Sequence, residues 1–166
     1  MDFYYVHDDV LTRDQHIAME RFAFGVIGKD ADLLYKLESC KCFTPLVDIA
    51  SKHFDLTNAL YYELWQQYNP DVVAPHIDKD EKLYLRQILK TPLCSLVFYH
   101  NVSQDIEGGE LVIEGPDGTN HEIKPKTNRL VVFQRKLIHW VKDYEGHRHS
   151  ILCNPWDRPL GIVDDV

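Results

Sequence analysis

The sequence predicts a mainly β fold with helices at its N-terminal end. Two observations predict it. Apolar stripes at helical spacing occupy residues 1–56, and short apolar runs separated by turn residues fill residues 57–156. Short antiparallel strands joined by turns are typical of a sandwich or barrel. At 166 residues the chain is expected to form a single domain, in which residues 157–166 are a C-terminal tail.

Three helices are expected in the N-terminal part. Thr12 and Gln15 form a capping-box pattern, which predicts a helix that begins after Thr12 and ends near Gly25. A second helix is expected over residues 30–37, and Pro45 stands at the favourable first turn of a third. We expect the apolar stripes of these helices to cover one face of a sheet.

The remainder of the chain predicts strands. Residues 60–68 are rich in tyrosine and tryptophan, and residues 93–101 form a continuous apolar run typical of a buried central strand. Turn residues at 115–118 separate two short apolar segments, which predicts a hairpin. Further strands are expected at residues 129–133, 137–141 and 148–154.

The composition argues against two classes of partner. The net charge of −8 disfavours binding of a nucleic-acid backbone through bulk electrostatics, although Lys124, Lys126 and Arg129 are a candidate basic patch. No apolar run is long enough to span a membrane, so no membrane partner is expected. The oligomeric state is left open.

The N-terminus and the cysteines bear on localisation. Residues 1–8 lack the basic and then apolar layout of a secretory signal, so a cytoplasmic location is expected. A metal site built from Cys40, Cys42 and His53 is disfavoured, because the spacing fits no common zinc pattern. We expect four reduced thiols: Cys40, Cys42, Cys94 and Cys153.

Two histidines and an aspartate form a candidate metal site. His76 and Asp78 are separated by one residue, and side chains two apart on a strand point to the same face. With His139 they would offer two imidazoles and one carboxylate. Such a set holds iron(II) on one face and leaves the opposite positions open for substrate and oxygen.

Arg148 follows His139 by nine residues and has two interpretations. Residues 137–141 and 148–152 are expected to form a hairpin, which would bring Arg148 close to His139 and place Ser150 on the face of Arg148. A buried guanidinium there could form a bidentate pair of hydrogen bonds with one carboxylate of a dicarboxylate. The alternative is a surface salt bridge within the hairpin.

The order of these pieces resembles the 2-oxoglutarate and iron(II)-dependent dioxygenases, especially their prolyl hydroxylase branch. The resemblance covers about residues 61–155 and implies a double-stranded β-helix (jelly-roll) core with the N-terminal helices on its outer side. It rests on these segments: Tyr68-Asn69-Pro70, His76-Ile77-Asp78, Leu96–Asn101, Glu107–Leu111, Asn128–Phe133, His139 and Gly146–Ile151.

The resemblance also implies the site. His76, Asp78 and His139 would bind Fe(II), and Arg148 would pair with the far carboxylate of the cosubstrate 2-oxoglutarate. Other hydrogen bonds to the cosubstrate would come from Tyr99, Ser150 and Tyr68. For Tyr99 the alternative is core packing. Oxygen is the second cosubstrate, and ascorbate is a candidate reductant.

The expected activity is hydroxylation of a C–H bond with release of succinate and CO2. A peptide or protein side chain is the expected substrate, with proline as first choice. The alternatives are a free amino acid or small metabolite, or a metal-binding jelly-roll module without turnover. The segment 79–91 leaves the metal site directly and is either a substrate-selecting lid or an ordinary connection. The other seven histidines are expected to be surface or structural residues, with His149 facing outward.

Overall fold

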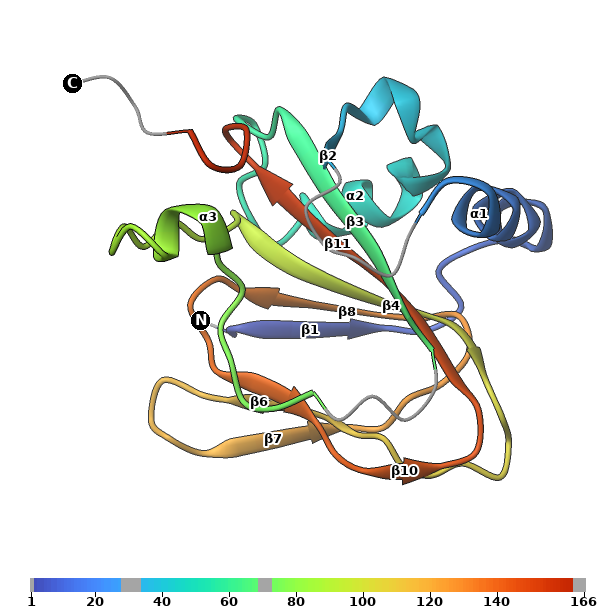
Figure 1. The fold of residues 1–166 in the computed structure, drawn as a ribbon. Helices are drawn as coiled ribbons and strands as arrows, with labels where there is room; N and C mark the ends of the chain where they lie inside the picture. Colours follow the sequence, from blue (N-terminus) through green and yellow to red (C-terminus); the bar gives the residue numbers. More distant parts are fainter. Residues whose placement is uncertain (1, 28–33, 69–72, 163–166) are drawn as a thin grey trace.

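In a computed structural model, which describes residues 2–27, 34–68 and 73–162, the chain forms two facing antiparallel sheets (Figure 1). The main sheet has the order β1 (Tyr4–His7), β8 (Arg129–Gln134), β4 (Cys94–Val102), β11 (Arg148–Trp156), β3 (Tyr61–Tyr68), β2 (Leu34–Tyr35). The second sheet has the order β7 (Asn120–Ile123), β6 (Leu111–Glu114), β9 (His139–Val141). A short ribbon pairs β5 (Glu107–Gly108) with β10 (Tyr144–Glu145).

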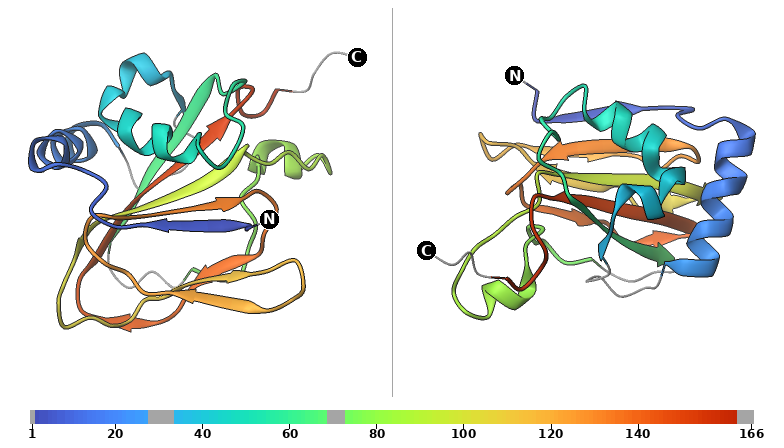
Figure 2. Two further views of the ribbon diagram at one scale, coloured as in Figure 1. Left: turned by 180° about the vertical axis from the view of Figure 1, so that it is seen from behind. Right: turned by 90° about the horizontal axis from the view of Figure 1, so that it is seen from above.

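Helices cover the outer face of the main sheet (Figure 2). The helix α1 (Arg13–Val26) begins with the predicted capping box of Thr12 and Gln15, and α2 (Thr44–Ala50) has Pro45 in its first turn. Their buried faces belong to one apolar cluster with the outward residues of the sheet: Met19, Ala23, Leu46, Leu64, Leu96, Leu130 and Ile151. The opposite face of the main sheet packs on the second sheet.

This two-sided covering explains the long apolar runs. Nearly every residue of β4 is buried, and every residue of β11 is buried. The expected central strand near residues 93–101 and the expected hairpin of β6 and β7 are therefore confirmed. Inner-face residues of the two sheets form a second apolar cluster: Val97, Tyr99, Leu111, Ile113, Ile123, Val131, Phe133 and Leu152.

The N-terminal third differs from the prediction in two places. Residues 4–7 form the edge strand β1, which pairs with β8, where no strand was expected. The predicted helix over residues 30–37 is wrong in its described part, because Leu34 and Tyr35 pair with β3 and a 3-10 helix follows at Leu37–Ser39. Residues 30–33 of that prediction lie outside the described residues. Such short segments take their conformation from a pairing partner and not from local propensity.

The predicted hairpin between residues 137–141 and 148–152 is also wrong. The strand β9 pairs with β6 in the second sheet, whereas β11 pairs with β3 and β4 in the main sheet. His139 and Arg148 therefore face each other across the interior and not along a ladder. His76 and Asp78 lie in an extended segment in which only a single bridge, from His76 to His139, pairs the chain.

Two smaller expectations concern the cysteines and the candidate basic patch. All four cysteines are free, as expected of reduced thiols. Asp8 pairs with two of the three cations of the candidate basic patch, Arg129 and Lys126, and these cations hold the pKa of its carboxyl far below the usual range. Among the described residues, no helix is long and apolar enough to cross a membrane. The segment after Asp78 contains the short helix α3 (Glu81–Tyr84).

Candidate metal centre and cosubstrate pocket

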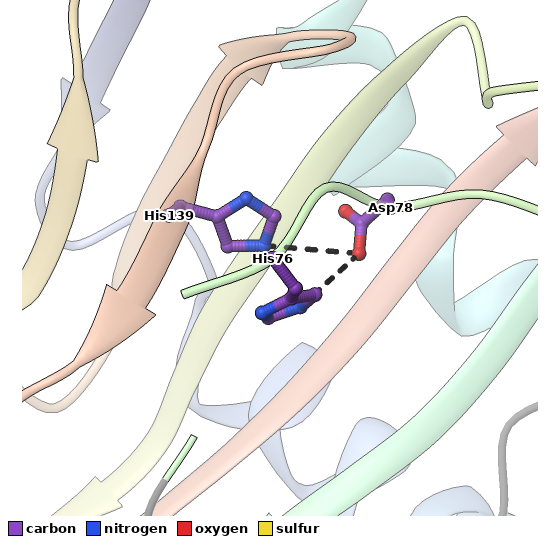
Figure 3. Close-up of side chains that lie close together, drawn as sticks. All are labelled: His76, Asp78 and His139. Atoms are coloured by element: carbon purple, nitrogen blue, oxygen red, sulfur yellow. Dashed lines mark ion pairs between the residues drawn. The ribbon is translucent and has the colours of Figure 1, made fainter. Parts of the chain in front are cut away.

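The three predicted metal ligands converge at one end of the space between the sheets (Figure 3). Their ligand atoms lie within 4.8 Å of one another, and among the described residues this is the one cluster of its kind. The Nε2 atoms of His76 and His139 each lie 3.7 Å from Oδ1 of Asp78. The His76 side chain is 37% exposed and that of His139 only 6%. The centre is therefore open to solvent on the His76 side.

Hydrogen bonds to the backbone set the tautomer of both imidazoles. Nδ1–H of His76 donates to the carbonyl of Ala74 at 2.8 Å, and Nδ1–H of His139 donates to that of Leu137 at 3.1 Å. Each Nε2 therefore keeps its lone pair, as a metal ligand requires. Burial lowers the pKa of His139 although the Asp78 carboxylate acts in the opposite direction. A lowered pKa keeps this imidazole neutral.

Ser95 supports the third ligand. Its hydroxyl donates a short hydrogen bond to Oδ2 of Asp78, which leaves Oδ1 facing the two histidines. Ser95 lies on β4 with Tyr99, four residues later, on the same face. Sequence reasoning missed Ser95, because nothing local links it to Asp78. The signal available was that Ser95, a polar residue in the apolar first half of β4, lies an even number of residues from Tyr99 and so shares its face.

Arg148 lies 2% exposed in the interior. Its Nη1 donates to the Ser150 hydroxyl at 3.1 Å, and its Cζ lies 5.0 Å from the ring centre of Tyr99. Within the described part of the chain, Nε of Arg148 and the buried hydroxyl of Tyr99 have no hydrogen-bond partner, and no carboxylate pairs with the guanidinium. A buried unpaired charge is costly, and this group of donors is suited to an anionic ligand.

One cavity joins the two histidines of the metal centre to this arginine. It has a volume of about 60 Å³ and is lined by His76, His139 and Arg148 together with apolar walls that include Val97 and Leu152. A larger hollow of about 400 Å³ beside His53 lies at the surface, away from these groups. Converging polar groups identify a functional site better than size does. Gln67 and Trp65 also line the cavity and were missed from the sequence.

Of the predicted site residues, His76, His139 and Arg148 line the cavity, and Asp78, Tyr99 and Ser150 contact or face these three. Tyr68 lies elsewhere. It pairs in register with His149, and its ring centre lies 5.1 Å from that of His149, on the outer face of the sheet. His149 itself points away from Arg148 as expected, but it is buried and not exposed. Its Nε2–H donates to Oε1 of Gln66 beneath α1.

Gly108 and Gly109 let the chain pass close to the arginine. Both have positive φ angles, of 78° and 74°. A Cβ at Gly108 would lie 2.1 Å from the Asp143 carbonyl oxygen, and one at Gly109 would lie 3.4 Å from Cδ of Arg148. A side chain is excluded at Gly108, so the close approach of β5 and β10 depends on glycine there.

The sequence comparison identifies the family. The 2OG-Fe(II) oxygenase superfamily matches residues 64–156, more than half of the chain. The protein belongs to this superfamily and is a 2-oxoglutarate- and iron(II)-dependent dioxygenase. The matched region contains His76, Asp78, His139 and Arg148. No curated protein sequence matches the chain.

Solved structures with the same fold include three prolyl hydroxylases. The first, a prolyl-4-hydroxylase from Pseudomonas putida, has 20% identity and a TM-score of 0.65 over 93% of this chain and 88% of that one. The second, from Trichoplax adhaerens, was solved with a hypoxia inducible factor oxygen degradation domain peptide fragment (16%, 0.62, 95% and 84%). The third is a viral collagen prolyl hydroxylase from Paramecium Bursaria Chlorella virus-1 in a 2OG complex (14%, 0.62, 92% and 94%). At these identities the likeness concerns the fold, and it confirms the predicted double-stranded β-helix.

Proposed function

We propose that this dioxygenase hydroxylates an unactivated C–H bond, with His76, Asp78 and His139 as the iron ligands and Arg148 as the anchor of 2-oxoglutarate. One observation carries the proposal. A histidine pair beside an aspartate shares a cavity with a buried guanidinium that has no carboxylate partner among the described residues. Iron(II), 2-oxoglutarate and oxygen would together supply the oxidant, with succinate and CO2 as coproducts and ascorbate as a candidate reductant.

The residues fit the cosubstrate chemically. Arg148 offers free donors at its guanidinium, the Tyr99 hydroxyl is buried without a partner among the described residues, and Ser150 already hydrogen-bonds to Arg148. A carboxylate held by two or three such donors is bound in a bidentate manner and at low dielectric. The apolar walls formed by Val97 and Leu152 exclude water from the ion pair between Arg148 and the bound carboxylate. Tyr68, on the outer face, is not part of the proposed cosubstrate site.

For the substrate we propose a peptide or protein side chain, with proline first. Support comes from the fold, which is shared with prolyl hydroxylases, one of them solved with a peptide. The opening on the His76 side offers a route for such a chain, and the neighbouring segment 79–91 presents apolar side chains, of which Leu85 is 84% exposed. Hydroxylation of a free amino acid or small metabolite is the outcome that the substrate test must exclude.

The metal assignment is tested by iron binding. Asp78→Ala and His139→Ala are expected to abolish binding of Fe(II) at micromolar metal under anaerobic conditions, with little change in the melting temperature. His147→Ala is the matched control, because His147 is exposed and lies outside the cavity. Parental iron stoichiometry in both site variants would reject the assignment.

The reaction is tested by products. The parental protein with Fe(II), oxygen and 2-oxoglutarate should release succinate, and the release should rise when a true substrate is added. Proline-containing peptides and free amino acids are then screened by mass spectrometry for the gain of one oxygen. Oxygen gain confined to free amino acids would contradict the peptide proposal while leaving the hydroxylase proposal in place.

A further inference from the structure

The segment that follows the metal ligand Asp78 is a closed loop. Asp78 is joined to β4 by the hydrogen bond from Ser95, and the backbone N–H of Asp80 donates to the carbonyl of Lys90 at 2.9 Å. The first contact holds the start of the segment against β4, and the second holds it against the end of the segment at Lys90. The base of the loop therefore lies at the metal centre, whereas most of residues 81–89 are exposed, with Leu85 at 84% and Leu83 buried.

The Asp80 carboxylate connects this base to two other parts of the chain. It is 1% exposed. Oδ1 accepts from the N–H of Leu83 at 3.0 Å and so caps α3. Oδ2 accepts from the N–H of Gly161 at 2.6 Å, in the C-terminal tail. Backbone donors therefore hold both oxygens of this carboxylate.

The tail reaches this position through a tight approach. Gly161 has a φ of 78°, and a Cβ there would lie 3.0 Å from Cδ of Lys82 in α3. After β11 the last described residues turn back beside α3, as both Figure 1 and Figure 2 show. The tail thus contacts the N-cap residue of α3, Asp80, through a backbone donor at a glycine with a left-handed conformation.

We infer that Asp80 is a positioning residue that makes the C-terminal tail a structural support of the metal centre. The inference rests on the proposed role of Asp78 as a ligand. Asp80 holds the backbone two residues after Asp78, and it does so through the tail on one side and through α3 on the other. Loss of the tail contact should loosen the loop base and, with it, the orientation of the Asp78 carboxylate.

A helix cap alone does not require both oxygens of the Asp80 carboxylate. Asparagine caps helices about as well as aspartate, because one side-chain oxygen is sufficient. The second oxygen of Asp80 is the one that accepts from Gly161. In Asp80→Asn, if the oxygen keeps the cap, an NH2 group faces the Gly161 N–H and the tail contact is lost. This substitution therefore separates the cap from the tail contact.

The test uses Asp80→Asn and a chain ending at residue 159, which removes Gly161. The matched controls are a chain ending at residue 162, which keeps Gly161, and Asp55→Asn, at an exposed aspartate that also accepts from backbone. Co(II) serves as the probe metal, and its affinity and visible absorption spectrum are measured. Backbone hydrogen exchange of residues 81–90 is measured on the metal-free proteins.

We expect both test variants to remain folded at the assay temperature, with a lower melting temperature for Asp80→Asn, to exchange residues 81–90 faster and to bind Co(II) about tenfold more weakly with an altered spectrum. Removing groups that support a metal ligand typically weakens metal binding by about 10- to 100-fold, and a tenfold loss is the low end of that range. Both controls should match the parent. Parental Co(II) affinity and spectrum in the test variants would overturn the inference, even if exchange became faster. Parental Co(II) binding by His139→Ala would instead reject the metal assignment itself.

Discussion

Arg148 and His149 are neighbours on β11, both are buried, and they face opposite sides of the same sheet. On the outer side, His149 donates to Gln66, whose amide in turn donates to the carbonyls of Ala23 and Ile27 near the end of α1. On the inner side, Arg148 has the Ser150 hydroxyl and aromatic rings, but no carboxylate among the described residues.

The difference shows how a structural polar residue is distinguished from a binding residue. The outer network is completed by the protein, so it orients α1 on the sheet. Donors on the inner side lack acceptors among the described residues. The guanidinium of Arg148 is permanently charged, so it cannot lower the free-energy cost of its burial by losing a proton. His100, on the outer face, also lacks partners for its ring nitrogens within the described residues. Its pKa is lowered to about 4 by burial, so it stays neutral and its burial costs less.

The largest expected effect is on the inner side. Arg148→Gln should weaken binding of 2-oxoglutarate by about 2–5 kcal/mol, the usual cost of removing one partner of a buried ion pair. Metal binding should be spared, and the free energy of unfolding of the ligand-free protein should not fall. Isothermal titration into the Mn(II)-loaded protein measures the affinity. Arg129→Gln, which breaks the pair with Asp8, is the control. An unchanged dissociation constant for Arg148→Gln would show that another cation binds the cosubstrate.

On the outer side the effect should be on stability alone. Gln66→Ala leaves the Ile27 carbonyl and the His149 N–H without their side-chain partner, while the Ala23 carbonyl keeps the backbone N–H of Ile27. The free energy of unfolding should therefore fall by about 1–3 kcal/mol. Affinity for 2-oxoglutarate should stay parental. Urea unfolding measures the change. Gln67→Ala, one residue later and lining the interior cavity, should leave stability near the parental value. Equal losses in the two variants would contradict the division between the faces.

The outer face should also make stability depend on pH. Burial lowers the pKa of both His100 and His149 to about 4, whereas an unfolded histidine has a pKa near 6.5. Between these values the unfolded chain binds more protons than the folded one. The free energy of unfolding should therefore fall as the pH falls from about 6.5 to 4. Thermal melts across this range test it, and His100→Leu should reduce the slope. A slope unchanged in that variant would exclude His100 as a source.

The smallest effect is expected from Tyr99→Phe. It deletes one hydroxyl that has no partner in the described chain, so stability should be unchanged. If that hydroxyl binds the cosubstrate, affinity for 2-oxoglutarate should fall by about 0.5–1.5 kcal/mol, the net value of one hydrogen bond. The same titration as for Arg148→Gln measures it. A parental affinity would assign Tyr99 to core packing, the alternative that the sequence left open.

The sequence by itself determined the features that depend on local spacing. The capping box at Thr12, the buried run of β4 and the hairpin of β6 and β7 follow from neighbours within a few residues, and each is present. The ligand pattern from His76 to Arg148 indicated the family for the same reason, because the order and spacing of chemical groups are written in the chain.

Only the tertiary structure decided which strands pair and which buried groups meet. The hairpin expected between His139 and Arg148 is absent, because their strands join opposite sheets, and Tyr68 lies on the face away from the cavity. The contact of Ser95 with Asp78 and that of Gly161 with Asp80 span 17 and 81 residues of sequence. Strand pairing depends on the burial of both faces of the sheet at the same time. The sequence pattern of a single strand does not show which other strands will cover its two faces.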